Sequence, residues 1–292
     1  MTTLNNNAVN QPKAHEIEVR KPGVFGKIKW AVVKAGFATF GRTSKGVRTG
    51  YRFGFDSGNM LDYVYVNKAH GTLLVGKLVD RFYLNSIGWR GIRARRVLLK
   101  QMLKSEIEKN RADGIKTRIL DVAAGPGRYL QELLQEIGEE KGDVEVLCRD
   151  LSLAGVVQGL QQAQEAGIKH IHYEQGDAFN PAPTNATLGS APNVIVVSGL
   201  YELMLEDEII RTSLKTLHKF LTPGGAIFYT AQNRHPQLEF IANVLPNRDG
   251  IPWVMRCRSV EAMDLWGREA GFKQVESRIE EVGLFSVTTG RK

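Results

Sequence analysis

The chain has 292 residues, of which 42% are hydrophobic and 24% are charged, and its formal net charge is +8. These are ordinary values for a globular protein, so they exclude a fibrous or wholly disordered chain. No apolar run approaches the eighteen or so residues of a membrane-spanning helix, and the polar first residues are unlike a signal peptide. We therefore expect a cytoplasmic protein with one large α/β domain and an additional element.

The positive charge is concentrated in the first 55 residues, where ten lysines and arginines accompany only two glutamates. Residues 1–22 are polar and rich in asparagine, which predicts a disordered basic tail. From Val24 to Phe40, apolar side chains recur at helical spacing beside lysines, which predicts a basic amphipathic helix. Such a helix suits peripheral contact with an anionic membrane, such as the inner membrane face, contact with a partner, or closure over the protein's own cleft, and these alternatives stay open.

The segment that follows is expected to complete a helical region. Gly41 to Gly58 is rich in glycine and basic residues and is predicted to be turn-like. Apolar periodicity resumes from His70 to Asn85, and a helix is predicted from Gly91 to Asn110. We therefore expect residues 23–112 to form an N-terminal helical cap in front of a sheet domain over residues 113–292.

The stretch Ile119–Leu130 predicts a strand, a tight loop and the start of a helix. The strand ends at Asp121, and small residues follow, among them Ala123, Gly125 and Gly127. Without bulky side chains, the backbone of this loop can approach a ligand closely, and the helix behind it offers free N–H groups. The position of the third glycine in a dinucleotide-binding fingerprint holds leucine, and Asp121 would repel a pyrophosphate. The loop therefore favours a ligand with a positive end.

Two more acids follow predicted strands. Val144 to Cys148 is the second strand, with Asp150 just beyond it, and the short third strand from His172 ends at Asp177. An acid after the second strand can accept hydrogen bonds from both hydroxyls of a ribose. Since the carboxyl ends of parallel strands meet at one edge of a sheet, the three acids are expected to point at one crevice.

The fourth and fifth strands lead to candidate catalytic side chains. Tyr201 and Glu202 follow the strand Val194–Val197, and we expect them to orient an acceptor or take its proton. His235 follows the strand Ala226–Thr230, and it is a candidate general base because histidine titrates near neutrality. A purely structural role, in packing or capping, remains the alternative for each of the three.

The acid, the glycine loop and the two later acids, in this order and spacing, resemble the class I S-adenosylmethionine-dependent methyltransferases. The resemblance covers residues 116–292 and implies an α/β, Rossmann-like fold, with a seven-stranded sheet whose last strand is antiparallel. More narrowly, the chain is similar to a bacterial group of proteins assigned as methyltransferases, some of which are fused to α/β-hydrolase domains. This likeness extends upstream to the segments Gly54–Gly58 and Ser86–Arg90.

The resemblance implies S-adenosylmethionine as the cofactor, and it implies that each motif binds a different part of this molecule. Ala123, at the family's usual first glycine, and Gly125 would lie against the methionine part, and Asp150 would bind the ribose. Asp177 and the two residues after it would hold the adenine. Separately from the resemblance, the cap carries a cluster of arginines, Arg90, Arg93, Arg95 and Arg96, and one of them, most simply Arg90, is expected to pair with the methionine carboxylate. A solvated helix face remains the alternative for this cluster. No metal is expected. The expected cofactor-binding residues are Asp121, Ala123, Gly125, Gly127, Asp150, Leu151, Asp177, Ala178, Phe179, Ser198 and Arg90.

The acceptor is less defined by the sequence. The Asn/Asp-Pro-Pro-Tyr signature of many family members that methylate nucleic-acid nitrogens is absent after the fourth strand, which argues against nucleic acid. The amphipathic arm favours a small hydrophobic or anionic acceptor, lipid-like or a natural-product intermediate. The alternatives are a non-catalytic, adenosylmethionine-binding regulatory module and an RNA methyltransferase. The acceptor atom and the oligomeric state stay open.

Overall fold

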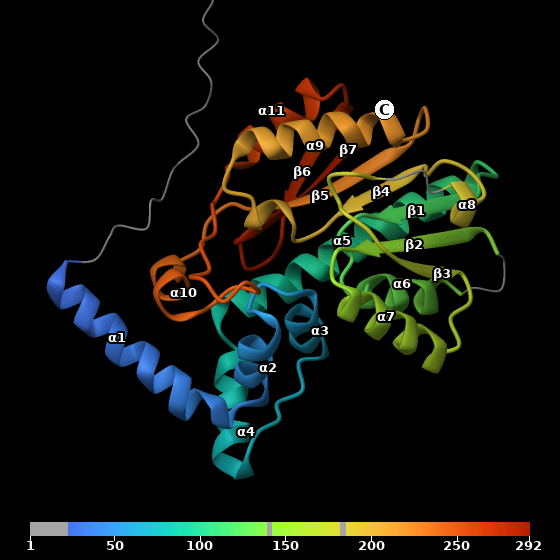
Figure 1. Cartoon of the computed structure of the whole chain (residues 1–292). Coiled ribbons are helices and arrows are strands. Elements are labelled where there is room, and N and C mark those ends of the chain that lie inside the picture. Colours follow the sequence, from blue (N-terminus) through green and yellow to red (C-terminus); the bar gives the residue numbers. More distant parts are fainter. Residues whose placement is uncertain (1–22, 139–141, 182–184) are drawn as a thin grey trace, which may run out of the picture.

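A computed structural model describes residues 23–138, 142–181 and 185–292, so the tail predicted over residues 1–22 lies outside the described residues. Figure 1 shows a twisted sheet with helices on both faces, and the helices from the first part of the chain gathered at one end of that sheet.

The sheet has seven strands in the order β3-β2-β1-β4-β5-β7-β6. β7 runs antiparallel to both β5 and β6, whereas the pairs from β3 to β5 are parallel. This confirms the predicted seven-stranded sheet with an antiparallel last strand. The strands are β1 (Thr117–Asp121), β2 (Val144–Asp150), β3 (Ile171–Gln175), β4 (Val194–Val197), β5 (Ala226–Gln232), β6 (Lys273–Ile279) and β7 (Phe285–Arg291).

The strand order places a switch point between β1 and β4. From β1 the chain moves outward through β2 to β3, and it then returns to the other side of β1 with β4. In open α/β sheets, ligands bind outside the carboxyl ends of the strands at such a point. β4 is a continuous apolar run because both faces of the central strands are covered. Ile119 and Leu120 of β1 and Ile195 of β4 are fully buried.

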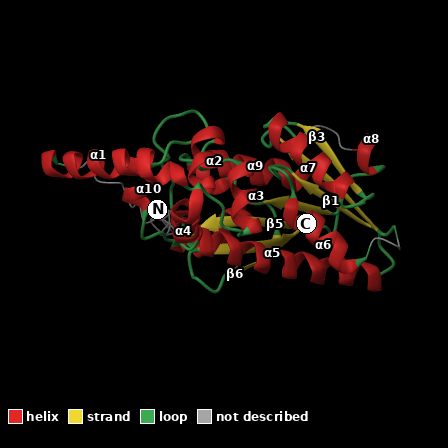
Figure 2. Ribbon diagram, turned by 90° about the horizontal axis from the view of Figure 1, so that it is seen from below, coloured by secondary structure: helices red, strands yellow, loops and turns green. Residues whose placement is uncertain are grey.

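Helices cover the two faces of the sheet in separate sets, with α9 and α11 on one side and α6 and α7 on the other (Figure 1), and Figure 2 gives the view from below. Leu103 of α5 and Leu133 of α6 share a core with Ile119, while Leu214 of α9 and Trp266 of α11 belong to the core on the opposite face. One set is α5 (Ile87–Ala112), α6 (Arg128–Ile137) and α7 (Leu153–Glu165), and the other is α8 (Asn185–Leu188), α9 (Asp207–Phe220) and α11 (Val260–Glu269).

The remaining helices form a cap with a core of its own. That core joins Phe55, Met60 and Trp89 to Leu238 and Trp253, which come from the segment after β5. None of the helices within the described residues is long and apolar enough to cross a membrane. The cap elements are α1 (Val24–Thr39), η1 (Phe40–Thr43), α2 (Lys45–Phe53), α3 (Gly58–Val66), α4 (Leu73–Leu84), the first turns of α5, and α10 (Leu238–Val244).

The prediction of a turn-like segment from Gly41 to Gly58 is wrong, because this segment contains α2. The side chain of Ser44 caps the helix by accepting a hydrogen bond from the N–H of Val47. Gly46 and Gly50 lie four residues apart on one face, and a Cβ on Gly50 would lie 2.3 Å from the ring of Phe55. The glycines therefore serve close helix packing, which offsets their weak helix propensity.

Candidate active site

Two cavities meet beyond the carboxyl ends of β1 and β4. One, of about 530 Å³, lies over the glycine loop that follows β1, and we call it the loop cavity. The other, of about 440 Å³, lies between the cap and the sheet, and we call it the cap cavity. Asp56, Leu61, Gly199 and Leu203 line both cavities, so ligands bound in the two would be neighbours.

The glycine loop has a backbone shape that glycine makes accessible. Gly125 and Gly127 have φ angles of 54° and 65°, in the left-handed region. The N–H of Gly125 donates a hydrogen bond of 2.7 Å to Asp150 Oδ2, which ties the loop to the end of β2. A Cβ on Gly127 would lie 2.8 Å from the Sγ of Cys148. The loop can therefore present backbone to a ligand without side chains in between.

Asp150 is fixed as a hydrogen-bond acceptor. Its Oδ1 accepts a hydrogen bond of 2.8 Å from the N–H of Ser152, and its Oδ2 accepts the one from Gly125. Each carboxylate oxygen has a second lone pair, and the side chain lines the loop cavity. Two oxygens held side by side suit the two hydroxyls of a ribose. The residues present therefore fit a nucleoside ligand.

The structure brings nine of the eleven expected cofactor residues to the loop cavity. Asp177 is exposed there, and its Oδ1 accepts a hydrogen bond of 2.9 Å from the N–H of Phe179. The two expected residues that do not line this cavity are Asp121 and Arg90. The nine are Ala123, Gly125, Gly127, Asp150, Leu151, Asp177, Ala178, Phe179 and Ser198.

Asp121 lies beneath the loop and does not line the cavity. It is fully buried, and its carboxylate accepts hydrogen bonds from the hydroxyl of Tyr129 and from the N–H of Ala123. Burial raises the pKa of Asp121 to about 7, although these two hydrogen bonds act in the opposite direction. We conclude that Asp121 positions the glycine loop, and the expected direct contact with the ligand is corrected accordingly.

The expected role of Arg90 also requires correction. Arg90 is exposed on α5 and lines neither cavity, whereas Arg95, on a different side of the same helix, is 2% exposed and lines the cap cavity. The loop cavity is lined instead by Arg128 and Arg248, which form ion pairs with carboxylates of the cap. Arg128 directly follows the glycine loop, so its position at the start of a helix was a signal available in the sequence.

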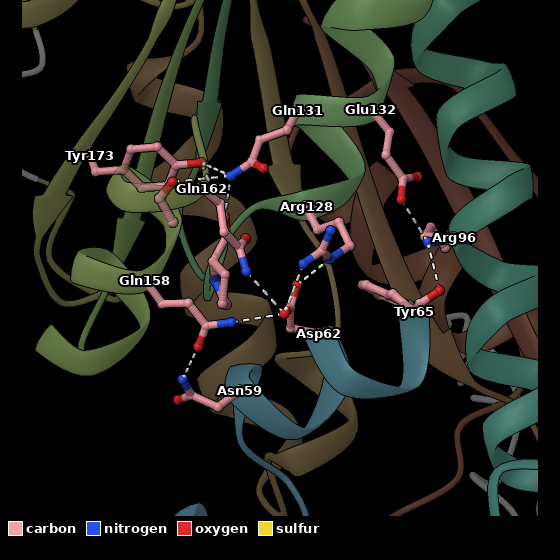
Figure 3. Close-up of polar contacts among 12 residues, drawn as sticks. Asn59, Asp62, Tyr65, Arg96, Arg128, Gln131, Glu132, Gln158, Gln162 and Tyr173 are labelled. Carbon is pink, nitrogen blue, oxygen red and sulfur yellow. Dashed lines mark hydrogen bonds and ion pairs between the residues drawn. The ribbon is translucent and has the colours of Figure 1, made fainter. Parts of the chain in front are cut away.

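A polar network binds the cap to the glycine loop (Figure 3). Asp62 of α3 is 7% exposed and pairs with Arg128, and it also accepts hydrogen bonds of 2.8 and 3.2 Å from Gln158 and Gln162 of α7. Nearby, a Cβ on Gly58 would lie 2.8 Å from the Cα of Gly125, so the two backbones touch. The cap therefore rests directly on the loop, and the first residues of α3 complete the loop cavity.

Tyr201 and Glu202 lie in the short helix η3 (Tyr201–Leu203), and they point in different directions. Tyr201 is 1% exposed in the sheet core, its hydroxyl lies 3.0 Å from Ser213 Oγ, and it lines neither cavity. This placement fits the structural alternative for Tyr201 and gives no support to a catalytic role.

Glu202 lines the cap cavity and is held by two donors. Its Oε1 accepts hydrogen bonds of 2.8 Å from Arg95 Nη1 and of 2.8 Å from the hydroxyl of Thr230. Thr230 in turn accepts a hydrogen bond of 2.9 Å from the N–H of Gly199. The other oxygen of Glu202, Oε2, has no hydrogen-bond partner within the described part of the chain, although it is buried. One acceptor is thus available beside the junction of the cavities.

His235 also lines the cap cavity, but its hydrogen bonds do not suit a general base. Burial lowers the pKa of His235 to about 4, so its ring is neutral at pH 7. Nδ1 accepts a hydrogen bond of 3.1 Å from the N–H of Gln237, which assigns the ring proton to Nε2. A Cβ on Gly88 would lie 2.6 Å from Nε2. His235 therefore offers a donor, where the sequence suggested a base.

The contact between Gly58 and Gly125 yields a test. We expect Gly58→Ala to weaken binding of S-adenosylmethionine, the cofactor that the resemblance implies, by about tenfold, because the added Cβ displaces loop backbone. Titration calorimetry measures this. Gly36→Ala is the matched control, since a Cβ on this helical glycine meets nothing within 4 Å. Equal affinities of the two variants would contradict a cap that shapes the loop.

The buried acid yields a second test. The pKa of Asp121 is raised from 3.8 to about 7 in the folded protein, so its contribution to stability is present below pH 4 and is lost as the pH rises through 7. The amide side chain introduced by Asp121→Asn does not ionise, so the variant does not lose this stability as the pH rises. Between pH 5 and pH 8, urea unfolding should show that the free energy of unfolding of the wild type falls by roughly 2 kcal/mol more than that of the variant. The control Glu165→Gln, at an exposed position, should show the same pH dependence of stability as the wild type. If Asp121→Asn also shows the wild-type pH dependence, the carboxyl of Asp121 is already ionised at pH 5 and the expectation is wrong.

Comparison with known proteins agrees with this geometry. A family model described as "Putative methyltransferase" matches residues 4–292. Over 251 residues the chain is 45% identical to the uncharacterized protein YnbC of Escherichia coli strain K12, covering 85% of this chain and 42% of YnbC. The chain thus spans less than half the length of this curated relative.

Solved structures show the same fold at low sequence identity. The S-adenosylmethionine-dependent methyltransferase SibL, in its apo form, has a TM-score of 0.53 and 15% identity, with 90% of this chain and 76% of SibL covered. An O-methyltransferase from Nostoc punctiforme PCC 73102, described as putative, has a TM-score of 0.52 and 13% identity, with 92% and 67% covered. S-adenosylmethionine is the cofactor that goes with this fold and family. The chain belongs to the family described as "Putative methyltransferase" and has the class I fold of adenosylmethionine-dependent methyltransferases.

Proposed function

We propose that this chain transfers the methyl group of S-adenosylmethionine to a small hydrophobic acceptor that carries one polar group. The observation that carries this proposal is the junction of the two cavities at Leu61, Gly199 and Leu203. A ligand in the loop cavity and a ligand in the cap cavity meet there, at the carboxyl end of β4. Methyl transfer by in-line displacement needs such an arrangement, since its main requirement is alignment of the two reactants.

The walls of the cap cavity favour an apolar acceptor. Phe37, Trp89, Ile92, Ile241 and Met255 are among the side chains that line it. Transfer of apolar surface from water into such a site is favourable by about 25 cal/mol per Å². The volume of about 440 Å³ lies within the range of small-molecule sites.

The polar groups of the cap cavity fit the reactive end of such an acceptor. Arg95, Glu202, Gln232 and His235 line the cavity near the ends of the strands. The available Oε2 of Glu202 can accept a hydrogen bond from an acceptor hydroxyl or amine and take its proton, while Nε2–H of His235 can donate one. The cofactor, when bound, supplies an activated methyl group on a sulfonium. These residues orient the acceptor and, with the cap above them, exclude water.

The inner side of α1 forms part of the wall of the cap cavity. The rings of Trp30 and Phe37 lie 6.4 and 5.8 Å from the ring of Phe240 of α10, measured between centroids. Val33, between them, lines the cap cavity. This side of the amphipathic helix therefore roofs the proposed acceptor site.

Cofactor binding is tested at Asp150. We expect Asp150→Ala to weaken S-adenosylmethionine binding by at least about tenfold, because the carboxylate is the proposed acceptor for the ribose hydroxyls. Calorimetry with the cofactor and with its demethylated product measures the loss, and thermal unfolding shows whether the variant is folded. Glu165→Gln, an exposed acid on α7, is the control and should bind as the wild type does. Unchanged affinity of a folded Asp150→Ala would remove the assignment.

The acceptor is tested with methyl-labelled cofactor and an organic extract of cells. We expect label to appear in a molecule that partitions into the organic phase. Val33→Trp should reduce this product about tenfold, because the indole fills the cap cavity, and cofactor affinity should stay unchanged. Ala31→Trp, at an exposed position on α1, is the matched control.

Three outcomes would count against the proposed acceptor. Label found only in water-soluble products would point to a polar acceptor, and label on RNA would point to an RNA methyltransferase. Tight cofactor binding without any labelled product would favour a non-catalytic binding module.

A further inference from the structure

Two cap helices expose a run of large apolar side chains. On α1, Phe25 is 89% exposed and Val32 is 68% exposed, and on α4, Leu73 and Leu74 are 84% and 80% exposed. α4 packs on η1, the turn that continues α1, and exposed apolar side chains gathered in this way mark an interaction site. We call the set the docking face, and its members are Val24, Phe25, Ile28, Val32, Leu73, Leu74, Val75, Leu78 and Phe82.

The docking face is separate from the side of α1 that packs on the protein. At 100° per residue, Phe25, Ile28 and Val32 fall on the opposite side of the helix from Trp30 and Phe37, whose rings contact α10. Figure 1 shows α1 along the outer edge of the molecule, with α10 on its inner side. α1 is therefore apolar on two sides, and packing against the cap accounts for one of them.

The charges beside the docking face are positive. Residues 23–55 contain seven lysines and arginines and no acid. Lys27, Lys29 and Lys34 are exposed on α1, and Lys77 and Arg81 are exposed on α4, whose aspartate, at position 80, is fully buried. A second copy of the chain in a two-fold dimer would bring these cations against one another. Anionic headgroups above an apolar layer complement both the charge and the apolar side chains.

The docking face also adjoins the mouth of the cap cavity. Phe82 lines this cavity and is nevertheless 78% exposed, so it stands at the rim. Val33 and Phe37 of α1 line the same cavity, and η1 connects α1 to the segment that packs on α4. An apolar molecule that leaves a lipid layer at this face would enter the cap cavity without crossing water.

We propose that α1 and α4 dock this protein on an anionic lipid surface, with the cap cavity open toward the lipid. The inference rests on the proposed function in one respect, which is that it names the lipid layer as the source of the hydrophobic acceptor. Docking itself depends on the exposed side chains and the cations, and it is measured without cofactor or acceptor.

The full chain is sedimented with vesicles of phosphatidylcholine, with and without phosphatidylglycerol. We expect binding to the anionic vesicles that weakens as salt is added, because cations contribute to it. The combined variant Phe25→Ser with Leu74→Ser should bind at least about tenfold more weakly, since both side chains are exposed on the docking face. The matched control is Leu160→Ser with Ile279→Ser, which removes two exposed apolar side chains from α7 and β6 and should bind as the wild type does. Circular dichroism checks that each variant is folded.

The outcomes separate docking from methyl transfer. A wild-type chain that ignores anionic vesicles, or a folded docking-face variant that binds them as well as the control, overturns docking. A dimer in light scattering that becomes a monomer in the docking-face variant also overturns it, since a second copy would then cover the face. If the docking-face variant still transfers methyl groups to a detergent-dispersed extract, the proposed function stands. If the wild type binds anionic vesicles but transfers no methyl group, only the proposed function is wrong.

Discussion

The ion pair between Arg95 and Glu202 joins the cap to the sheet where the two cavities meet. Both side chains are almost fully buried, and the distance between Arg95 Nη1 and Glu202 Oε1 is 2.8 Å. Buried charges are costly unless they are paired and hydrogen-bonded, and here Thr230 adds a hydrogen bond and the ring of Phe285 lies 4.9 Å from the guanidinium. Removing either partner would leave the other charge uncompensated. The pair connects α5 to η3, the short helix that follows β4, and both side chains line the cap cavity.

The site is built from two parts of the chain that are far apart in sequence. The sheet supplies the glycine loop and the acids after the strands, and the cap supplies the roof over both cavities. Asp62 and Gly58 attach that roof to the loop itself. This arrangement gives the segments Gly54–Gly58 and Ser86–Arg90 a structural role in the site. Gly58 touches the loop, and Gly88 makes room for His235.

Local patterns in the sequence were enough for the sheet and for most of the loop cavity. Continuous apolar runs mark strands that are buried on both faces, and an acid after such a strand can only lie at its carboxyl end. The direction of a side chain on a helix is a different matter, because it depends on which side of the helix packs. Arg90 and Arg95 are both arginines on α5, but only Arg95 is buried.

Burial and hydrogen-bond partners account for the other differences. Tyr201 and Glu202 are neighbours in one short turn, and tertiary packing alone decides that one faces the core and the other a cavity. Asp121 has the expected place at the end of β1 but lies below the loop. The N–H of Gln237 donates a hydrogen bond to Nδ1 of His235, which leaves the ring proton on Nε2. A sequence pattern does not reveal this contact.

The contact of Gly58 with Gly125 has a thermodynamic consequence. There is no side chain between the two backbones to absorb a displacement, so a movement of α3 that widens one cavity also moves the loop that walls the other. If occupancy of one cavity moves α3, the affinity of the other cavity changes as well, and by linkage the two effects are equal in size.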